Sequence, residues 1–156
     1  MNSEGEVMAI DPRLLGYLNR ALAHEMAAVQ QYMAQSRLCD LWNMSEHCAH
    51  FRQDVIEELE HVESLMAALL KLGAAPNATQ LPPVRLGRSL EEMVGIDRVL
   101  EVEAIRLYEE AAAYCARVRD FAHHALFDKI LRDELQHLDE LDKMSAALPD
   151  TERRYA

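Results

Sequence analysis

Apolar residues recur at alternating intervals of four and three positions along four long stretches of the chain. This spacing is typical of helices that bury one face in a bundle. The first stretch opens at Asp11 and Pro12, an N-cap residue followed by a proline at the first helical position. The positions that define the four buried faces are Leu14, Leu18, Ala21, Ala28, Tyr32, Gln35 and Cys39; Phe51, Val55, Val62, Leu65, Leu69 and Leu72; Val94, Asp97, Ala104, Tyr108, Ala112 and Cys115; and Phe127, Ile130, Leu138 and Leu141. We therefore expect four long helices.

The helix boundaries follow from capping residues and breakers. The second helix is expected to begin near Ser45, a plausible N-cap, and to end at Gly73. Ser89, followed three positions later by a glutamate, is a capping-box signal that starts the third helix. The fourth helix follows a short break at residues 119–121 and ends before Pro149.

The lengths of the connections predict the topology. Helices one and two, and helices three and four, are joined by short links, so each pair forms an antiparallel hairpin. Residues 73–89 form a long link that carries three of the five prolines and two of the five glycines. We predict an all-α four-helix bundle in which a long crossover joins two antiparallel hairpins. Residues 1–156 form a single domain, with the bundle at about residues 11–148.

Composition and charge exclude several classes of function. A net charge of −11 argues against a nucleic-acid partner and against an anionic membrane surface. The longest purely apolar run, Leu65 to Leu70, is far too short to span a membrane. The three cysteines are odd in number and form no Cys-x-x-Cys motif, and the N-terminus has no signal-peptide pattern. We therefore expect a cytoplasmic protein.

Four glutamates break the apolar pattern. Glu25, Glu58, Glu101 and Glu134 all fall on the predicted buried faces. An ionised carboxylate in a core costs roughly several kcal/mol unless it is paired or binds a metal. Four such positions in one bundle are expected only if the carboxylates compensate one another.

The spacing of these glutamates indicates a metal site. The separation between Glu25 and Glu58 is the same as that between Glu101 and Glu134. Four residues recur in the second half of the chain at one constant separation, here called the repeat offset. Adding this offset to the positions of Glu25, Tyr32, Glu58 and His61 gives those of Glu101, Tyr108, Glu134 and His137. Both histidines lie in Glu-x-x-His pairs, so the chain reads as two copies of one hairpin whose ligands meet in the bundle centre. Four carboxylates and two imidazoles suit two divalent iron or manganese ions, whose charge of +4 balances the four carboxylates.

An ordinary surface-charge interpretation is the alternative. With seven histidines in an acidic chain, a single Glu-x-x-His pair has little weight. The shared repeat offset, the two lone glutamates and the helical placement favour the metal site.

Four segments carry a resemblance to the bacterioferritin family: HEMAAVQQY (24–32), EELEH (57–61), LEVEAIRLY (100–108) and LRDELQH (131–137). The resemblance extends from about Asp11 to Met144 and includes the second Glu-x-x-His, which classical ferritins lack. It implies a ferritin-like bundle and a di-iron ferroxidase that uses dioxygen or hydrogen peroxide to oxidise Fe(II) to Fe(III) for iron storage and detoxification. It also implies that Glu58 and Glu134 bridge the two irons. Terminal ligands would be the carboxylates of Glu25 and Glu101 and the imidazoles of His61 and His137.

Two departures from the family pattern affect the expected partners. Bacterioferritins bind haem through a methionine directly after the bridging glutamate of the second helix, and this chain has Leu59 there. We expect no methionine-ligated haem. After Pro149 only DTERRYA remains, too short and polar for a buried fifth helix. We expect a homodimer within a larger homo-oligomer or a mixed cage.

Further residues are candidates for supporting roles. Asp97 and Asp133 are expected to accept hydrogen bonds from the far sides of the imidazoles. Tyr32 and Tyr108 either hydrogen-bond a ligand, supply an electron or pack in the core. Residues 54 and 57 are both acidic and are expected on a solvated helix face. Surface or interface positions are expected for His24, His47, His50, His123 and His124.

Two other functions remain open at this point. A rubrerythrin-like di-iron peroxidase fits the paired Glu-x-x-His motifs, although that family carries a Cys-x-x-Cys iron domain that this sequence lacks. A non-haem subunit of a mixed ferritin cage with a vestigial site is the non-enzymatic alternative, which the six intact ligands oppose.

Overall fold

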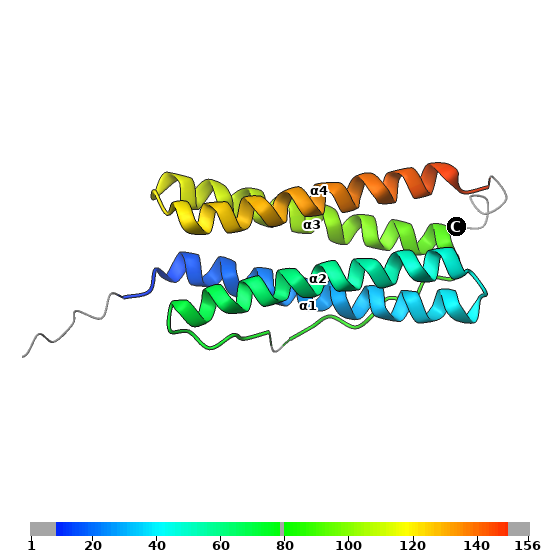
Figure 1. Cartoon of the computed structure of the whole chain (residues 1–156), viewed down its shortest axis with the longest axis horizontal. Helices are drawn as coiled ribbons and strands as arrows, with labels where there is room; N and C mark the ends of the chain where they lie inside the picture. The colour runs from blue at the N-terminus through cyan, green and yellow to red at the C-terminus, as the bar shows by residue number, and fades with distance from the viewer. Residues whose placement is uncertain (1–8, 79, 150–156) are drawn as a thin grey trace, which may run out of the picture.

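The computed structural model describes residues 9–78 and 80–149. Its helices are α1 (Pro12–Leu41), α2 (Ser45–Lys71), α3 (Leu90–Arg117) and α4 (Phe121–Ala147), and the described part of the chain contains no strand. The helices α1 and α2 form one antiparallel hairpin and α3 and α4 the other, with a long irregular connection along the bundle (Figure 1). The predicted four-helix bundle with its crossover is confirmed. The prediction that the chain lacks a fifth helix concerns residues 150–156, outside the described ranges.

Side-chain caps start three of the four helices. Asp11 Oδ1 accepts hydrogen bonds from the first turn of α1, including the backbone N–H of Arg13 at 2.9 Å. Ser89 Oγ accepts from the N–H of Glu92 at 3.1 Å, as the capping-box signal predicts for α3. Asp120 caps α4 in the same way. These caps satisfy N–H groups that the first helical turn leaves unpaired.

The start of α2 corrects one prediction. Ser45 is the first helical residue rather than the N-cap, and Met44 occupies the cap position without a side-chain hydrogen bond. The reason lies in the preceding turn. Asn43 adopts a positive φ of 58°, and the N–H of Met44 bonds back to the carbonyl of Cys39 at 2.9 Å. That turn completes the end of α1, and only residues 42–44 lie between the two helices.

Three helices end in the same way. Asn43, Gly73 and Arg119 follow α1, α2 and α3 with φ values of 58°, 78° and 61°. In each case the next residue donates its N–H to a carbonyl five positions back, and the left-handed residue donates to a carbonyl three back. This is the Schellman motif. Glycine adopts the left-handed conformation without strain, whereas the arginine after α3 does not.

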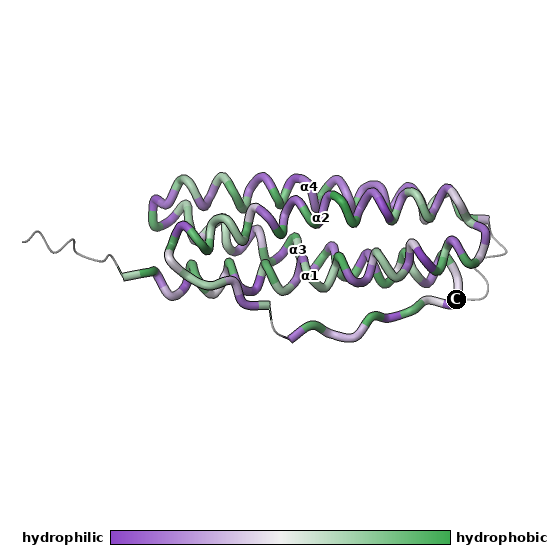
Figure 2. Tube along the Cα trace, turned by 60° about the horizontal axis from the view of Figure 1, so that its bottom comes forward, coloured by the Kyte–Doolittle hydropathy of each residue, from purple (hydrophilic) through white to green (hydrophobic). Residues whose placement is uncertain are grey.

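The predicted buried faces form two large apolar clusters on either side of a polar middle, and a small cluster of Ala28, Tyr32 and Val55. One cluster surrounds Leu18, Leu65 and Phe127, and the other surrounds Phe51 and Met93. All predicted face positions are buried except two: Leu72 and Leu138 are half-buried. The hydropathy trace in Figure 2 shows hydrophilic and hydrophobic residues alternating along every helix. None of the described helices is long and apolar enough to cross a membrane.

The crossover is fixed to the outside of α1. The amide of Gln31 donates to the carbonyl of Arg85 at 2.7 Å and accepts from the N–H of Arg85 at 2.9 Å. The connection then passes close to α3, where a Cβ added at Gly87 would lie 2.9 Å from the backbone nitrogen of Met93. The crossover therefore covers the α1 side of the bundle (Figure 2) and leaves α2 and α4 uncovered.

The left-handed arginine after α3 yields a stability prediction. Replacing Arg119 with glycine removes the steric cost of a Cβ at φ 61°. We expect the free energy of unfolding to rise by about 0.5–1 kcal/mol, measured by urea denaturation. Gly73→Ala, at the equivalent position after α2, should lower it by a similar amount. An Arg119→Gly chain that is no more stable than the parent would contradict this account of the turn.

Candidate metal centre

The centre of the bundle holds four glutamates and two histidines. One glutamate comes from α1 and one from α3, while α2 and α4 each supply a glutamate and a histidine three positions later, on the same helix face. Relative exposure is between 0% and 4% for all six: Glu25, Glu58, His61, Glu101, Glu134 and His137. All six predicted residues therefore meet at one place.

These six residues form two overlapping groups. One group contains Glu25 and His61, the other contains Glu101 and His137, and Glu58 and Glu134 belong to both. Within each group, one potential ligand atom per residue lies within 4.8 Å of the others. The arrangement offers two neighbouring positions for metal ions with two carboxylates shared between them, as the repeat offset predicts.

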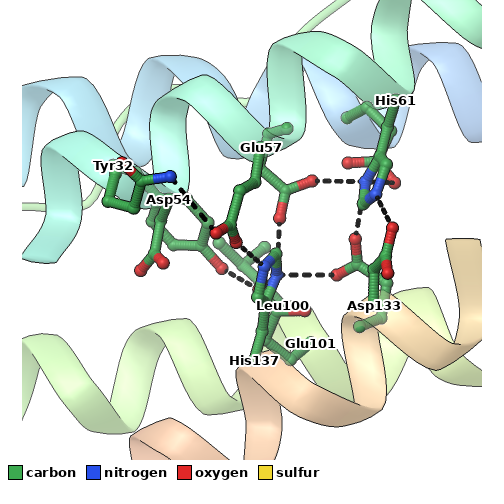
Figure 3. A network of polar contacts seen from close by, with 12 residues as sticks. Tyr32, Asp54, Glu57, His61, Leu100, Glu101, Asp133 and His137 are labelled. Carbon is green, nitrogen blue, oxygen red and sulfur yellow. Dashed lines mark hydrogen bonds and ion pairs between the residues drawn. The ribbon is translucent and has the colours of Figure 1, made fainter.

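Each imidazole directs its Nδ1 atom at the carboxylates. His61 Nδ1 lies 3.0 Å from Glu134 Oε1 and 3.2 Å from Glu58 Oε2. His137 Nδ1 lies 3.0 Å from Glu58 Oε1 and 3.7 Å from Glu101 Oε1. The two ring centroids are 6.3 Å apart. Figure 3 shows the two rings facing each other, one from α2 and one from α4. Both Nδ1 atoms can therefore serve as ligands.

The far side of each ring contacts a second carboxylate. His61 Nε2 lies 2.9 Å from Asp133 Oδ2, the contact that the sequence predicts. His137 Nε2 contacts Glu57, a residue that the sequence analysis placed on a solvated face. The missed signal was the repeat itself, because the repeat offset also converts Glu57 into Asp133. Such contacts fix the orientation and tautomer of an imidazole that binds a metal.

Asp97 does not contact either imidazole, contrary to the prediction. It is fully buried one helical turn before Glu101, and its Oδ1 accepts a hydrogen bond from Gln35 Nε2 at 2.7 Å. The reason is the direction in which the Asp97 side chain points. Asp97 faces α1, whereas both imidazoles lie on the opposite side of the bundle between α2 and α4. Its Oδ2 has no hydrogen-bond partner among the described residues.

The two tyrosines connect the hairpins crosswise. Tyr108 on α3 donates its hydroxyl to Glu25 Oε1 on α1 at 2.5 Å. Tyr32 on α1 donates to Glu101 Oε1 on α3. Of the roles left open by the sequence, the structure supports hydrogen bonding to a carboxylate. Each bond holds one oxygen of its glutamate, while the other oxygen, Oε2, has no hydrogen-bond partner among the described residues.

The buried environment divides the four carboxyl groups into two kinds. Burial, together with the charges of Glu134 and Glu58, raises the pKa of Glu25 well above its ordinary value. Burial and the contact with Glu134 likewise raise the pKa of Glu101. Burial alone would raise the pKa of Glu58, but its contacts with Glu25 and the two imidazoles lower it strongly. Burial also opposes ionisation of Glu134, yet its contacts with Glu101 and both imidazoles lower its pKa.

The imidazoles complement these carboxylates. Burial would lower the pKa of both rings, but contacts with three carboxyl groups raise the pKa of each far above its ordinary value. These pKa directions favour the protonated form of Glu25, Glu101 and both imidazoles when no cation is bound. In that state the negative charges of two carboxylates equal the positive charges of two imidazolium ions, so the metal-free centre has no net charge. Loss of those four protons would leave four carboxylates, whose charge two divalent ions balance.

The orphaned atoms of the centre fit metal ions better than protons. Glu25 Oε2 and Glu101 Oε2 are buried with neither a hydrogen bond nor an ion pair in the described structure, whereas Glu58 Oε1, Glu134 Oε1 and His137 Nδ1 have only the imidazole–carboxylate contacts of the centre. Buried polar atoms are seldom left unpaired. Their chemistry, carboxylate oxygen and imidazole nitrogen, is that of iron, manganese and zinc ligands.

Comparison with known proteins identifies the family. The fold and the paired groups are those of helical bundles that can hold two metal ions between carboxylates. Residues 15–150 match the model of the ferritin-like domain. The chain is 34% identical to bacterioferritin of Rhodobacter capsulatus over 85% of this chain and 82% of that protein. It is 32% identical to bacterioferritin of Mycolicibacterium paratuberculosis over 85% and 83%.

A solved structure agrees. The Rhodobacter capsulatus bacterioferritin structure, described with a metal-free dinuclear site and a haem iron in a crystallographic special position, is similar with a TM-score of 0.85. The sequence identity is 33%, covering 89% of this chain and 87% of that one. This chain therefore belongs to the bacterioferritin family of ferritin-like proteins, a family associated with iron storage.

The protonation pattern of the centre leads to a prediction about metal binding. Filling both positions with Co(II) at pH 7 should release about four protons per chain, two from carboxyl groups and two from imidazoles. Because protons compete with the cation, the affinity should fall as the pH falls. Proton release can be measured with a pH indicator in weakly buffered solution during the first two equivalents. Release of fewer than two protons would show that the metal-free centre is already deprotonated.

Proposed function

We propose that the chain is a ferroxidase that oxidises Fe(II) to Fe(III) at the six-residue centre, for iron storage and detoxification. The observation that carries the proposal is the pair of overlapping Glu/His groups sharing Glu58 and Glu134. Two ions held at adjacent positions can transfer two electrons together. Dioxygen takes up these electrons with two protons to give hydrogen peroxide, and hydrogen peroxide takes them up with two protons to give water.

The residues of the chain have separate tasks in this proposal. Glu58 and Glu134 lie between the two positions and hold both irons. Glu25 and Glu101 close the site on its α1 and α3 sides, with one oxygen of each fixed by a tyrosine hydroxyl. His61 on α2 and His137 on α4 complete the set of six ligands. Their protons leave as iron binds, so the loaded centre keeps no net charge in the bundle core.

Iron approaches the centre, in this proposal, through a groove between α2 and α4. The helices α2 and α4 border a groove of about 300 Å³ whose floor is formed by His61 and His137. Its walls carry Glu57, Asp133 and Glu140, and the one cation among its lining residues, Lys129, pairs with Asp133 at 3.5 Å. An acidic groove concentrates cations at its mouth. The imidazoles separate that groove from the carboxylates behind them.

The proposal includes an assembly without methionine-ligated haem. Leu59 points outward from α2 and, with Met33 and Ile56, belongs to the exposed large hydrophobic residues of the α1–α2 hairpin. A leucine cannot ligate haem iron. We propose that this apolar side pairs with a second copy of the chain inside a larger homo-oligomer or a mixed cage.

A rubrerythrin-like peroxidase is the competing function. Family membership and the absence of a Cys-x-x-Cys motif favour the ferroxidase. A vestigial site is disfavoured because all six side chains are present and point at one another.

Loss of a shared or terminal ligand tests the activity. Glu58→Ala and His137→Ala should each slow Fe(II) oxidation by at least roughly 100-fold, because loss of even an outer-shell partner costs metal sites 10–100-fold. The rate can be followed as ferric absorbance under air after anaerobic loading. Glu63→Ala, which removes an exposed carboxylate from α2, is the matched control and should behave like the parent. Parent-like oxidation by Glu58→Ala would refute the proposal.

A further inference from the structure

A second cluster of potential ligands lies beside the centre without sharing any of its six residues. His50 and Asp54 are one helical turn apart on α2, and Glu140 reaches them from α4. One ligand atom of each lies within 4.8 Å of the others. The sequence analysis placed both α2 residues on the surface. The structure corrects this for Asp54, which is only 6% exposed.

The carboxylate of Asp54 lacks the partners that a buried charge needs. Its one polar contact is His50 Nε2 at 3.3 Å, and no described residue donates a hydrogen bond to it. No lysine or arginine of the described residues forms an ion pair with Asp54 or with Glu140. A carboxylate in this position is costly unless a cation joins it.

The second copy of the hairpin has no such cluster. The repeat offset that relates the two halves converts His50 and Asp54 into Leu126 and Ile130, and it relates Glu140 to Ser64. Ile130 is buried in an apolar cluster, and Leu126 packs against it. The repeat offset relates the six central residues to one another, and it also relates Glu57 to Asp133. It does not relate this cluster to any equivalent in the second hairpin. The cluster is therefore a specific difference between the two hairpins and does not follow from the acidic composition alone.

The position of the cluster connects it with one half of the centre. Asp54 also lies within 4.8 Å of Glu57 and His137, counting one ligand atom from each. Figure 3 shows Asp54 and Glu57 on α2 beside the imidazole of His137 on α4. Gln136 Nε2 donates to Glu140 Oε1 at 3.0 Å and holds that carboxylate at the edge of the groove.

We propose that His50, Asp54 and Glu140 bind a third divalent transition-metal cation, next to the His137 side of the centre. One imidazole nitrogen and two carboxylate oxygens are a ligand set for Fe(II), Co(II) or Zn(II), with water completing the coordination. Glu140 lines the groove and the ring of His50 is partly exposed, so this site exchanges its cation with solvent more readily than the buried centre. The occupancy of this site does not depend on ferroxidase activity, because no residue is shared.

Metal stoichiometry with redox-inert Zn(II) tests the proposal. In equilibrium dialysis the parent chain should bind three Zn(II) per chain, two tightly and one more weakly. His50→Ala and Asp54→Asn should each bind two. Glu60→Gln, which removes an exposed carboxylate from the same groove, is the matched control and should bind three. The same number of bound Zn(II) ions in the parent and in His50→Ala would overturn the proposal.

Two further measurements separate this site from the centre and from folding defects. In the Glu58→Ala chain the dialysis should still show one Zn(II) that disappears when His50→Ala is added. Failure of the proposed ferroxidase centre would therefore leave this result intact. Thermal melting followed by circular dichroism should be the same for His50→Ala and the parent, since the ring is partly exposed. The His50 variant decides the outcome even if Asp54→Asn does not fold.

Discussion

The interaction on which the structure depends is the mutual neutralisation of four carboxyl groups and two imidazoles inside the bundle. A helical bundle of this length could have a continuous apolar core, yet its middle is polar and almost fully buried. Without cations, the raised pKa values of Glu25 and Glu101 and of both imidazoles favour a balance of charge inside the centre. The two apolar clusters on either side fix the helices so that these six groups stay together.

Duplication explains how a short chain builds such a centre. Two hairpins with the same residues at the same depths face each other, so each ligand has a counterpart across the bundle. The crosswise hydrogen bonds of Tyr32 and Tyr108 and the equivalent contacts of Glu57 and Asp133 follow the same relation. Where the repeat fails, at Asp54, the surroundings of the two Glu/His groups cease to be equivalent.

The sequence predicts the helix faces and the six central residues because helical periodicity determines both. Side-chain direction between helices is not determined in this way. Glu57 reaches His137 and Asp54 becomes buried because α2 and α4 approach each other, and Asp97 turns to Gln35 because α3 packs beside α1. These contacts depend on the distances between helices, which periodicity does not report. The repeat alone could have identified Glu57.

The most direct test of the central claim is anomalous diffraction at the iron edge from crystals loaded anaerobically with Fe(II). The account predicts two peaks inside the bundle. One should lie within ligand distance of Glu25 and His61, the other within ligand distance of Glu101 and His137, with both shared carboxylates between them. A single central peak, or iron bound only at the surface of the groove, would contradict the account.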